Sequence, residues 1–139
     1  MDDDAGPRAT PVRVVLADDE PLMLAGLSAI LNAQPDIDVL GTASDGRQAV
    51  DLVASSRPDV VCLDIEMPRM DGIEAARRIL AGADTGTQVV MLTTFRREDY
   101  LLESLQAGAS GFLLKTATPE QLAEGIRTVA SGEACSPPR

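Results

Sequence analysis

The chain has 139 residues, of which 45% are hydrophobic and 24% are charged. This length and balance are typical of one globular domain, and no apolar run approaches the roughly 18 residues that a membrane-spanning helix needs. The formal net charge of −10 argues against direct binding of nucleic acid by this chain, because such binding usually relies on a basic surface.

The chain contains no histidine, a single lysine (Lys115) and two cysteines, Cys62 and Cys135. Without histidine, Ser-His and Cys-His nucleophilic machinery is excluded, together with the commonest transition-metal ligand. Two cysteines in unrelated contexts do not indicate a disulfide framework, and a reducing cytoplasm is the simplest setting. Acid–base or metal chemistry must therefore depend on carboxylates, hydroxyls, backbone groups or cations.

Five short apolar runs alternate along the chain with amphipathic segments. The runs predict buried strands at 12–17, 37–43, 59–63, 88–92 and 111–114, and most are rich in valine or isoleucine. The segments between them predict helices at 21–31, 48–55, 73–80 and 100–107. A fifth helix begins after Thr118 as N-cap, with Pro119 in its first turn, and ends at Gly132.

Strands that alternate with helices predict a parallel sheet built from βαβ units. We therefore expect an α/β, doubly wound (βα)₅ flavodoxin-like fold, with helices on both faces and strand order 2-1-3-4-5. Residues 12–132 would form the domain. Residues 1–11 are predicted to be a disordered tail, and 133–139 a disordered tail or the start of a linker.

Polar residues follow the predicted strands at the edge where an open parallel sheet binds its ligands. They are Asp18, Asp19 and Glu20 after the first strand, Asp64 and Glu66 after the third, Thr93 and Thr94 after the fourth, and Lys115 after the fifth. Clustered carboxylates need a positive partner to stay ionised, and a hard divalent cation, best magnesium, meets that need with oxygen ligands. The lysine supplies a second positive charge for a phosphate-like group, and an aspartate in such a site can form an aspartyl phosphate.

Each of these residues has a simpler interpretation when it is taken alone. An aspartate after a strand is usually a turn or cap residue, residues 18–20 could cap the first helix, and a lysine at a strand end is usually solvated. Ser44, Asp45 and Gly46 after the second strand indicate a turn and helix cap, and for Asp45 a solvated position is favoured. The occurrence of the whole set at one sheet edge favours a functional site.

Four segments resemble the receiver domain of bacterial two-component response regulators. They are LADDE at 16–20, DIEMPRMDG at 64–72, LTTF at 92–95 and AGASGFLLK at 107–115, and the match extends over nearly all of 12–132. The sequences of residues 93–95 and 107–115 are similar to those of the subfamily that carries a C-terminal LuxR-type helix-turn-helix. The resemblance implies a phosphoacceptor regulatory domain, with no enzymatic chemistry beyond its own phosphorylation and dephosphorylation.

The resemblance also implies individual roles. Asp64 would accept a phosphoryl group from a histidine of a separate sensor kinase. Asp19, Asp64 and the backbone carbonyl of Glu66 would bind magnesium, with Asp18 acting through water, and Lys115 would pair with the phosphoryl oxygens.

The switch would involve Thr93, Thr94 and Phe112. Thr93 would move to hydrogen-bond the phosphoryl group and small Thr94 would leave space beside it. Phe112 lacks a hydroxyl, so its movement would be driven by packing alone. The output would be homodimerisation, either through the first and fifth helices or through the fourth helix, fifth strand and fifth helix. Homodimerisation would control a DNA-binding domain that is absent from this chain.

Three alternatives compete with this interpretation. The chain could be a stand-alone receiver that acts through protein–protein contacts, although the Pro-rich end at 136–138 is typical of a linker. A haloacid-dehalogenase-like phosphatase would need its nucleophile after the first strand and a second aspartate two residues later, where this chain has Glu20. A receiver-like module that never takes phosphate would be expected to lack a site residue, and none is missing.

Overall fold

The computed structural model describes residues 10–82, 86–94 and 98–132. Within them, five helices alternate with five strands: β2 (Val12–Ala17), α1 (Pro21–Asn32), β3 (Ile37–Ala43), α2 (Gly46–Ser56), β4 (Val60–Asp64), α3 (Gly72–Ala81), β5 (Gln88–Thr93), α4 (Glu98–Ala107), β6 (Gly111–Leu114) and α5 (Pro119–Ala130). The strands are parallel and lie in the order β3-β2-β4-β5-β6, which confirms the predicted order 2-1-3-4-5. The predicted tails lie outside the described residues, apart from residues 10 and 11. None of the described helices is long and apolar enough to cross a membrane.

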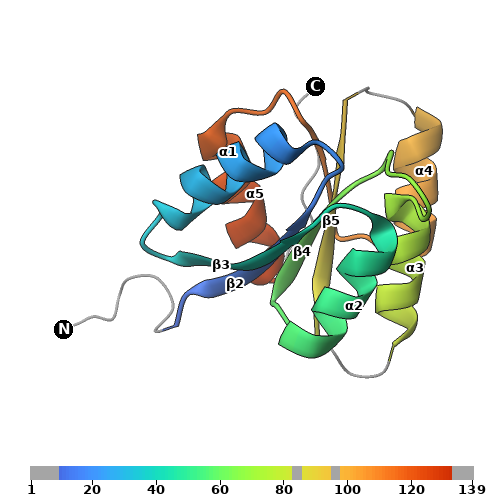
Figure 1. Ribbon diagram of the computed structural model, residues 1–139, viewed down its shortest axis with the longest axis horizontal. Coiled ribbons are helices and arrows are strands. Elements are labelled where there is room, and N and C mark those ends of the chain that lie inside the picture. The colour runs from blue at the N-terminus through green and yellow to red at the C-terminus, as the bar shows by residue number, and fades with distance from the viewer. Residues whose placement is uncertain (1–9, 83–85, 95–97, 133–139) are drawn as a thin grey trace.

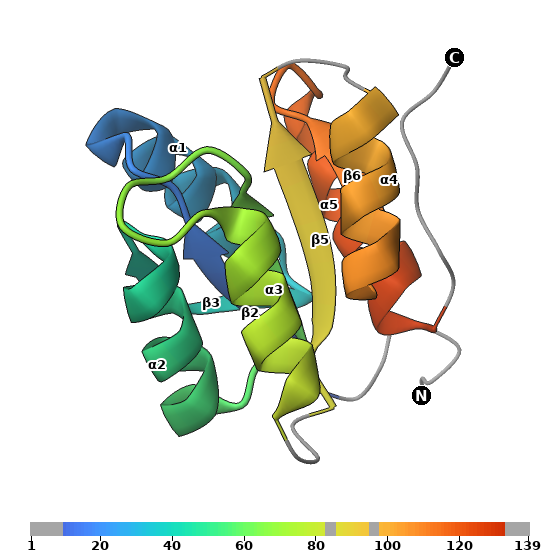
Figure 2. The same ribbon diagram turned by 90° about the vertical axis from the view of Figure 1, so that its right-hand side faces the viewer.

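Helices cover both faces of the sheet (Figures 1 and 2). The side chains of each strand alternate between the faces. Val15 and Ala17 of β2 belong to the core beneath α2, α3 and α4, whereas Val14 and Leu16 belong to the core beneath α1 and α5. This two-sided burial explains why the strands are continuous apolar runs in the sequence.

Two strands extend one residue further than predicted. β4 covers Val60–Asp64 rather than 59–63, because Asp64 still pairs with Leu92 across the sheet. β5 likewise includes Thr93, which pairs with Leu114. Asp64 and Thr93 are therefore the last residues of their strands rather than residues that follow them, and the sheet fixes their backbones.

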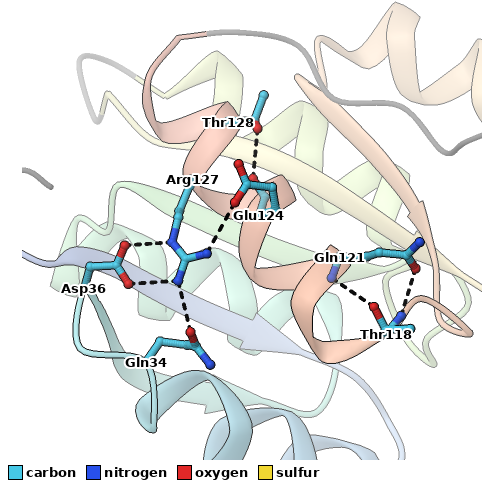
Figure 3. A network of polar contacts seen from close by, with 7 residues as sticks. All are labelled: Gln34, Asp36, Thr118, Gln121, Glu124, Arg127 and Thr128. Atoms are coloured by element: carbon cyan, nitrogen blue, oxygen red, sulfur yellow. Dashed lines mark hydrogen bonds and ion pairs between the residues drawn. The ribbon is translucent and has the colours of Figure 1, made fainter. Parts of the chain in front are cut away.

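Helix α5 is anchored by two polar networks (Figure 3). Its predicted cap is present: the Gln121 backbone N–H donates to Thr118 Oγ1 at 3.1 Å, and the Thr118 N–H donates to Gln121 Oε1 at 2.9 Å. Further along, Arg127 donates from Nε and Nη2 to the two carboxylate oxygens of Asp36, at 2.7 and 3.0 Å. This hydrogen-bonded guanidinium holds the pKa of Asp36 below its ordinary value and ties α5 to the segment that precedes β3.

Cys62 is a buried free thiol in the centre of β4. Burial raises the pKa of this thiol to about 12, so Cys62 packs as a small apolar side chain. Cys135 lies outside the described residues.

Candidate functional site

The first acidic residues of the site follow β2. The Asp18 backbone N–H donates to the Ala43 carbonyl at 3.0 Å, so Asp18 continues the pairing of β2 with β3. Its side chain is buried at 1% exposure, whereas neighbouring Asp19 is exposed. In the described part of the chain, α1 has no side-chain cap from Glu20, and the Glu20 N–H instead donates to Asp18 Oδ1 at 2.9 Å. These acids therefore do not serve as a conventional helix cap.

Asp64 lies at the adjacent strand end, opposite the acidic residues that follow β2. It is 3% exposed, and its Oδ1 accepts a long hydrogen bond of 3.3 Å from the Glu66 N–H. Carboxylate oxygens of Asp18, Asp19 and Asp64 all lie within 4.8 Å of one another. The topology thus gathers three carboxylates into one cluster, although Asp18 and Asp64 are 46 residues apart in the sequence.

Lys115 follows β6, and its side chain reaches these carboxylates. The Lys115 N–H donates to the Thr93 carbonyl at 2.8 Å, which extends the pairing of β6 with β5 beyond the last strand residue. Its ammonium Nζ lies 2.8 Å from Asp18 Oδ2 and 3.0 Å from Asp64 Oδ2, and the side chain is only 8% exposed. Glu20 Oε1 is a more distant partner at 3.4 Å. The single lysine of the chain is therefore shared among three carboxylates.

The electrostatics of the site reflect this crowding. Burial raises the pKa of Asp64 to about 6, although the hydrogen bond from Lys115 opposes that change. Burial alone would lower the pKa of Lys115, but its hydrogen bonds to Asp18 and Asp64 outweigh burial and raise the pKa above its ordinary value. The lysine remains charged, while the acidic cluster retains an excess of negative charge.

The donor set suits a hard divalent cation. The three clustered carboxylates offer only oxygen atoms, and the whole chain contains no histidine. One ammonium group cannot neutralise Asp18, Asp19 and Asp64 together, so a second cation would find a favourable electrostatic environment. Oxygen-only ligands at strand ends favour magnesium or calcium over the softer transition metals.

The remaining predicted residues differ in burial. Thr93 is 1% exposed at the end of β5, and Thr94 after it is exposed. Phe112 of β6 is buried at 3% exposure in the core beneath α2, α3 and α4. Glu66 is exposed, and its carboxylate Oε2 accepts a hydrogen bond of 2.7 Å from the Tyr100 hydroxyl. The structure thus brings Asp18, Asp19, Asp64 and Lys115 into one cluster. The other predicted residues lie on β5, on β6 or in the segments that follow β4 and β5.

Two contacts near the site were not predicted from the sequence. The expectation that Asp45 is solvated is wrong: it is 3% exposed, its Oδ1 accepts from the Gln48 N–H at 2.8 Å, and Arg69 reaches its Oδ2. The other contact joins Tyr100 to Glu66, which links α4 to the loop after β4. These pairs are 24 and 34 residues apart and follow no periodic pattern, so the sequence carries no signal for them.

Comparisons with known proteins agree with this geometry. Residues 14–127 match the family described as the response regulator receiver domain. An uncharacterized transcriptional regulatory protein of Bacillus subtilis, YxjL, is 47% identical over 123 residues, which are 88% of this chain and 56% of that protein. The chain thus spans little more than half the length of this curated relative.

Solved structures give the same result. The signal receiver domain of the putative response regulator NarL from Mycobacterium tuberculosis superposes with a TM-score of 0.86 at 34% identity, covering 89% of this chain and 99% of that one. A LuxR-family DNA-binding response regulator from Staphylococcus aureus has a TM-score of 0.81 at 28% identity, covering 86% of this chain and 98% of that one. The resemblance to LuxR-family regulators is therefore confirmed, and the chain belongs to the response regulator receiver domain family.

Proposed function

We propose that this chain is a cytoplasmic, phosphorylation-activated switch in which Asp64 accepts a phosphoryl group from a sensor histidine kinase. One observation carries the proposal: Lys115 Nζ lies within 3.0 Å of carboxylate oxygens of both Asp18 and Asp64, beside exposed Asp19. This arrangement combines a nucleophilic carboxylate, a fixed positive charge and further oxygen ligands at one sheet edge.

The proposed transfer is a displacement at phosphorus. A carboxylate oxygen of Asp64 attacks the phosphorus of a phosphohistidine, and the new P–O bond forms as the P–N bond to the donor imidazole breaks. The electron pair of the broken bond leaves with the donor nitrogen, which then takes a proton from solvent. Because this chain has no histidine, the donor imidazole lies outside it.

Magnesium would be held by Asp19, Asp64 and the backbone carbonyl of Glu66, with Asp18 acting through water. It would neutralise charge on the phosphoryl oxygens. Lys115 would pair with a phosphoryl oxygen as a point charge, for which its short distance to Asp64 already suits it.

The response would start at the end of β5. Phosphorylation adds about −1.5 to −2 charge and new acceptor oxygens. The Thr93 hydroxyl would donate to one of them, Thr94 would leave room beside it, and buried Phe112 would repack against α4. In the full-length protein this change would promote homodimerisation and control a DNA-binding domain, as the transcriptional regulators similar to this chain suggest.

Phosphorylation is tested with acetyl phosphate and magnesium, followed by intact mass spectrometry. We expect the wild type to gain one hydroxylamine-sensitive phosphoryl group, and Asp64→Asn to gain none. Asp38→Asn is the matched control, because Asp38 is an exposed strand aspartate remote from the cluster. Equal labelling of the wild type and Asp64→Asn would show that Asp64 is not the acceptor.

The role of Lys115 is tested separately with Lys115→Ala. We expect this variant to be labelled by acetyl phosphate. Light scattering should show an increase in dimer for the phosphorylated wild type and none for the phosphorylated variant. A dimer response equal to that of the wild type would contradict the proposed role of the lysine.

A further inference from the structure

The loop between β4 and α3 is attached to the start of α2. Figure 2 shows the chain arching beside the start of α2 before it enters α3. The Gly46 N–H donates to the Met70 carbonyl at 3.0 Å. Arg69 donates from Nε to Asp45 Oδ2 at 2.8 Å, and its Nη2 lies 2.7 Å from the same oxygen. The loop therefore has a backbone contact and an ionic contact with the N-terminal end of α2.

The ionic contact pairs an exposed cation with a buried anion. The Asp45 side chain is 4% exposed, whereas the Arg69 side chain is 68% exposed. Asp45 Oδ1 is already occupied, since it accepts the N-cap hydrogen bond from Gln48. Arg69 thus supplies the positive charge for the second oxygen of a carboxylate that the fold has largely removed from water.

The backbone conformation of Arg69 is unusual for a residue with a side chain. Its φ of 68° lies in the left-handed region, which costs free energy for any residue with a Cβ and is usually taken by glycine. An arginine in this position accepts that strain while its guanidinium contacts Asp45. This combination indicates that the side chain contributes something that glycine could not.

The same loop also packs closely against the backbone of Asp64, the last residue of β4. The Gly72 N–H donates to the Ile65 carbonyl at 2.9 Å, and a Cβ at Gly72 would lie 2.2 Å from the Asp64 carbonyl oxygen. At the other contact, a Cβ at Gly46 would lie 2.3 Å from the Met70 carbonyl oxygen. With both ends in such close contact, a shift of the loop at Arg69 cannot be absorbed without a shift near Asp64.

We propose that Arg69 is a positioning residue for the cation site: its pair with buried Asp45 holds the loop in the conformation that presents Asp64 and the Glu66 backbone to a divalent cation. This inference rests on the proposed function of the acidic cluster. Arg69 itself touches neither the cation nor the phosphoryl group, and it acts through the loop. Loss of a contact that orients metal ligands typically weakens metal affinity about 10- to 100-fold.

The test measures magnesium affinity by calorimetric titration, and stability by urea unfolding, for a series of variants. Arg69→Gly removes the guanidinium and relieves the backbone strain, whereas Arg69→Ala removes the guanidinium and keeps the strain. We expect both to bind magnesium about tenfold more weakly than the wild type, although Arg69→Gly is the more stable of the two. Arg69→Lys, which keeps the charge, should recover part of the affinity.

Two further variants complete the design. Asp45→Asn keeps an oxygen for the Gln48 cap and loses the charge, so it should weaken magnesium binding without adding to the effect of Arg69→Gly in the double variant. Arg77→Ala is the matched control, because Arg77 is an exposed arginine of α3 that pairs with Glu74 at 3.4 Å. Magnesium affinity of Arg69→Gly equal to that of the wild type would overturn the inference. Failure of the proposed function would differ, since the wild type and Asp64→Asn would then bind magnesium equally or not at all.

Discussion

Replacement of Asp64 by asparagine should stabilise the magnesium-free protein at neutral pH. Asp64 is 3% exposed, and burial raises its pKa to about 6 from the ordinary value of 3.8. Asparagine has nearly the same shape and carries no charge, so the variant removes the buried negative charge without creating a cavity. Lys115 keeps its partner Asp18 at 2.8 Å in the variant.

The sign and size of the effect follow from the direction of the pKa change. The folded state holds the Asp64 proton more tightly than the unfolded chain, whose aspartates titrate near a pKa of about 3.9. The free energy of unfolding therefore carries a penalty that is complete above the folded pKa and disappears as the pH falls below about 4. Two pKa units correspond to roughly 3 kcal/mol, and the lost hydrogen bond to Lys115 offsets about 1 kcal/mol of the gain. We expect Asp64→Asn to be more stable by about 1–3 kcal/mol at neutral pH.

Urea unfolding followed by circular dichroism measures this difference in the presence of EDTA. With a denaturant slope of about 1–3 kcal/mol/M, the midpoint should rise by roughly 1 M at neutral pH and by far less at about pH 4. Asp38→Asn serves as the exposed control and should leave the midpoint unchanged at both pH values. A midpoint that falls in Asp64→Asn at neutral pH, or a gain that is the same at about pH 4, would refute the reasoning.

The remaining predictions concern the stability of the scaffold, and urea unfolding checks each of them. Gly72→Ala should lower the free energy of unfolding by about 1–3 kcal/mol, because its Cβ would lie 2.2 Å from the carbonyl oxygen at the end of β4. Gly26→Ala, whose Cβ meets nothing within 4 Å, should instead raise it by about 0.5–1 kcal/mol; a larger loss here than at Gly72 would contradict the packing. Arg127→Ala should cost about 1–3 kcal/mol at neutral pH. Because Arg127 lowers the pKa of Asp36, the ion pair stabilises the protein above the pKa that Asp36 has in the unfolded chain, and this stabilisation is lost as the pH falls through the pKa of Asp36 in the folded protein. A destabilisation by Arg127→Ala that persists in acid would refute the pairing. Thr118→Ala should cost about 1 kcal/mol through loss of the capping box, and an unchanged midpoint would show that the cap is dispensable.

The fold could be predicted because its signals are local. Strands buried on both faces must be apolar throughout, and the cap at Thr118 marks a helix start within four residues of sequence. A strand boundary placed at the first polar residue ends β4 and β5 one residue too early. Asp64 and Thr93 are polar residues that remain in the sheet, since their backbones still pair with β5 and β6.

The cluster of Asp18, Asp64 and Lys115 could be predicted because topology alone brings those strand ends together. The supporting contacts could not. Asp45 is buried and paired with Arg69 of another loop, and Glu66 accepts a hydrogen bond from Tyr100 of α4. Such pairs depend on the exact course of loops between the elements, which neither hydrophobic periodicity nor turn chemistry determines.

The charge balance of the site would link cation binding to the proposed phosphorylation of Asp64. Asp18, Asp19, Glu20 and Asp64 present four carboxylates to one ammonium, which leaves a formal charge of −3 when all are ionised. Replacement of the Asp64 charge by an acyl phosphate of about −2 would increase that excess, so the phosphorylated state needs a further cation more than the resting state does. Coupling between two ligands is reciprocal: a cation that favours the phosphorylated state must itself bind more tightly to it. Lys115 cannot supply this coupling alone, because its charge is already shared in the resting state. Its proposed part in the switch would be to exchange a carboxylate partner for a phosphoryl oxygen.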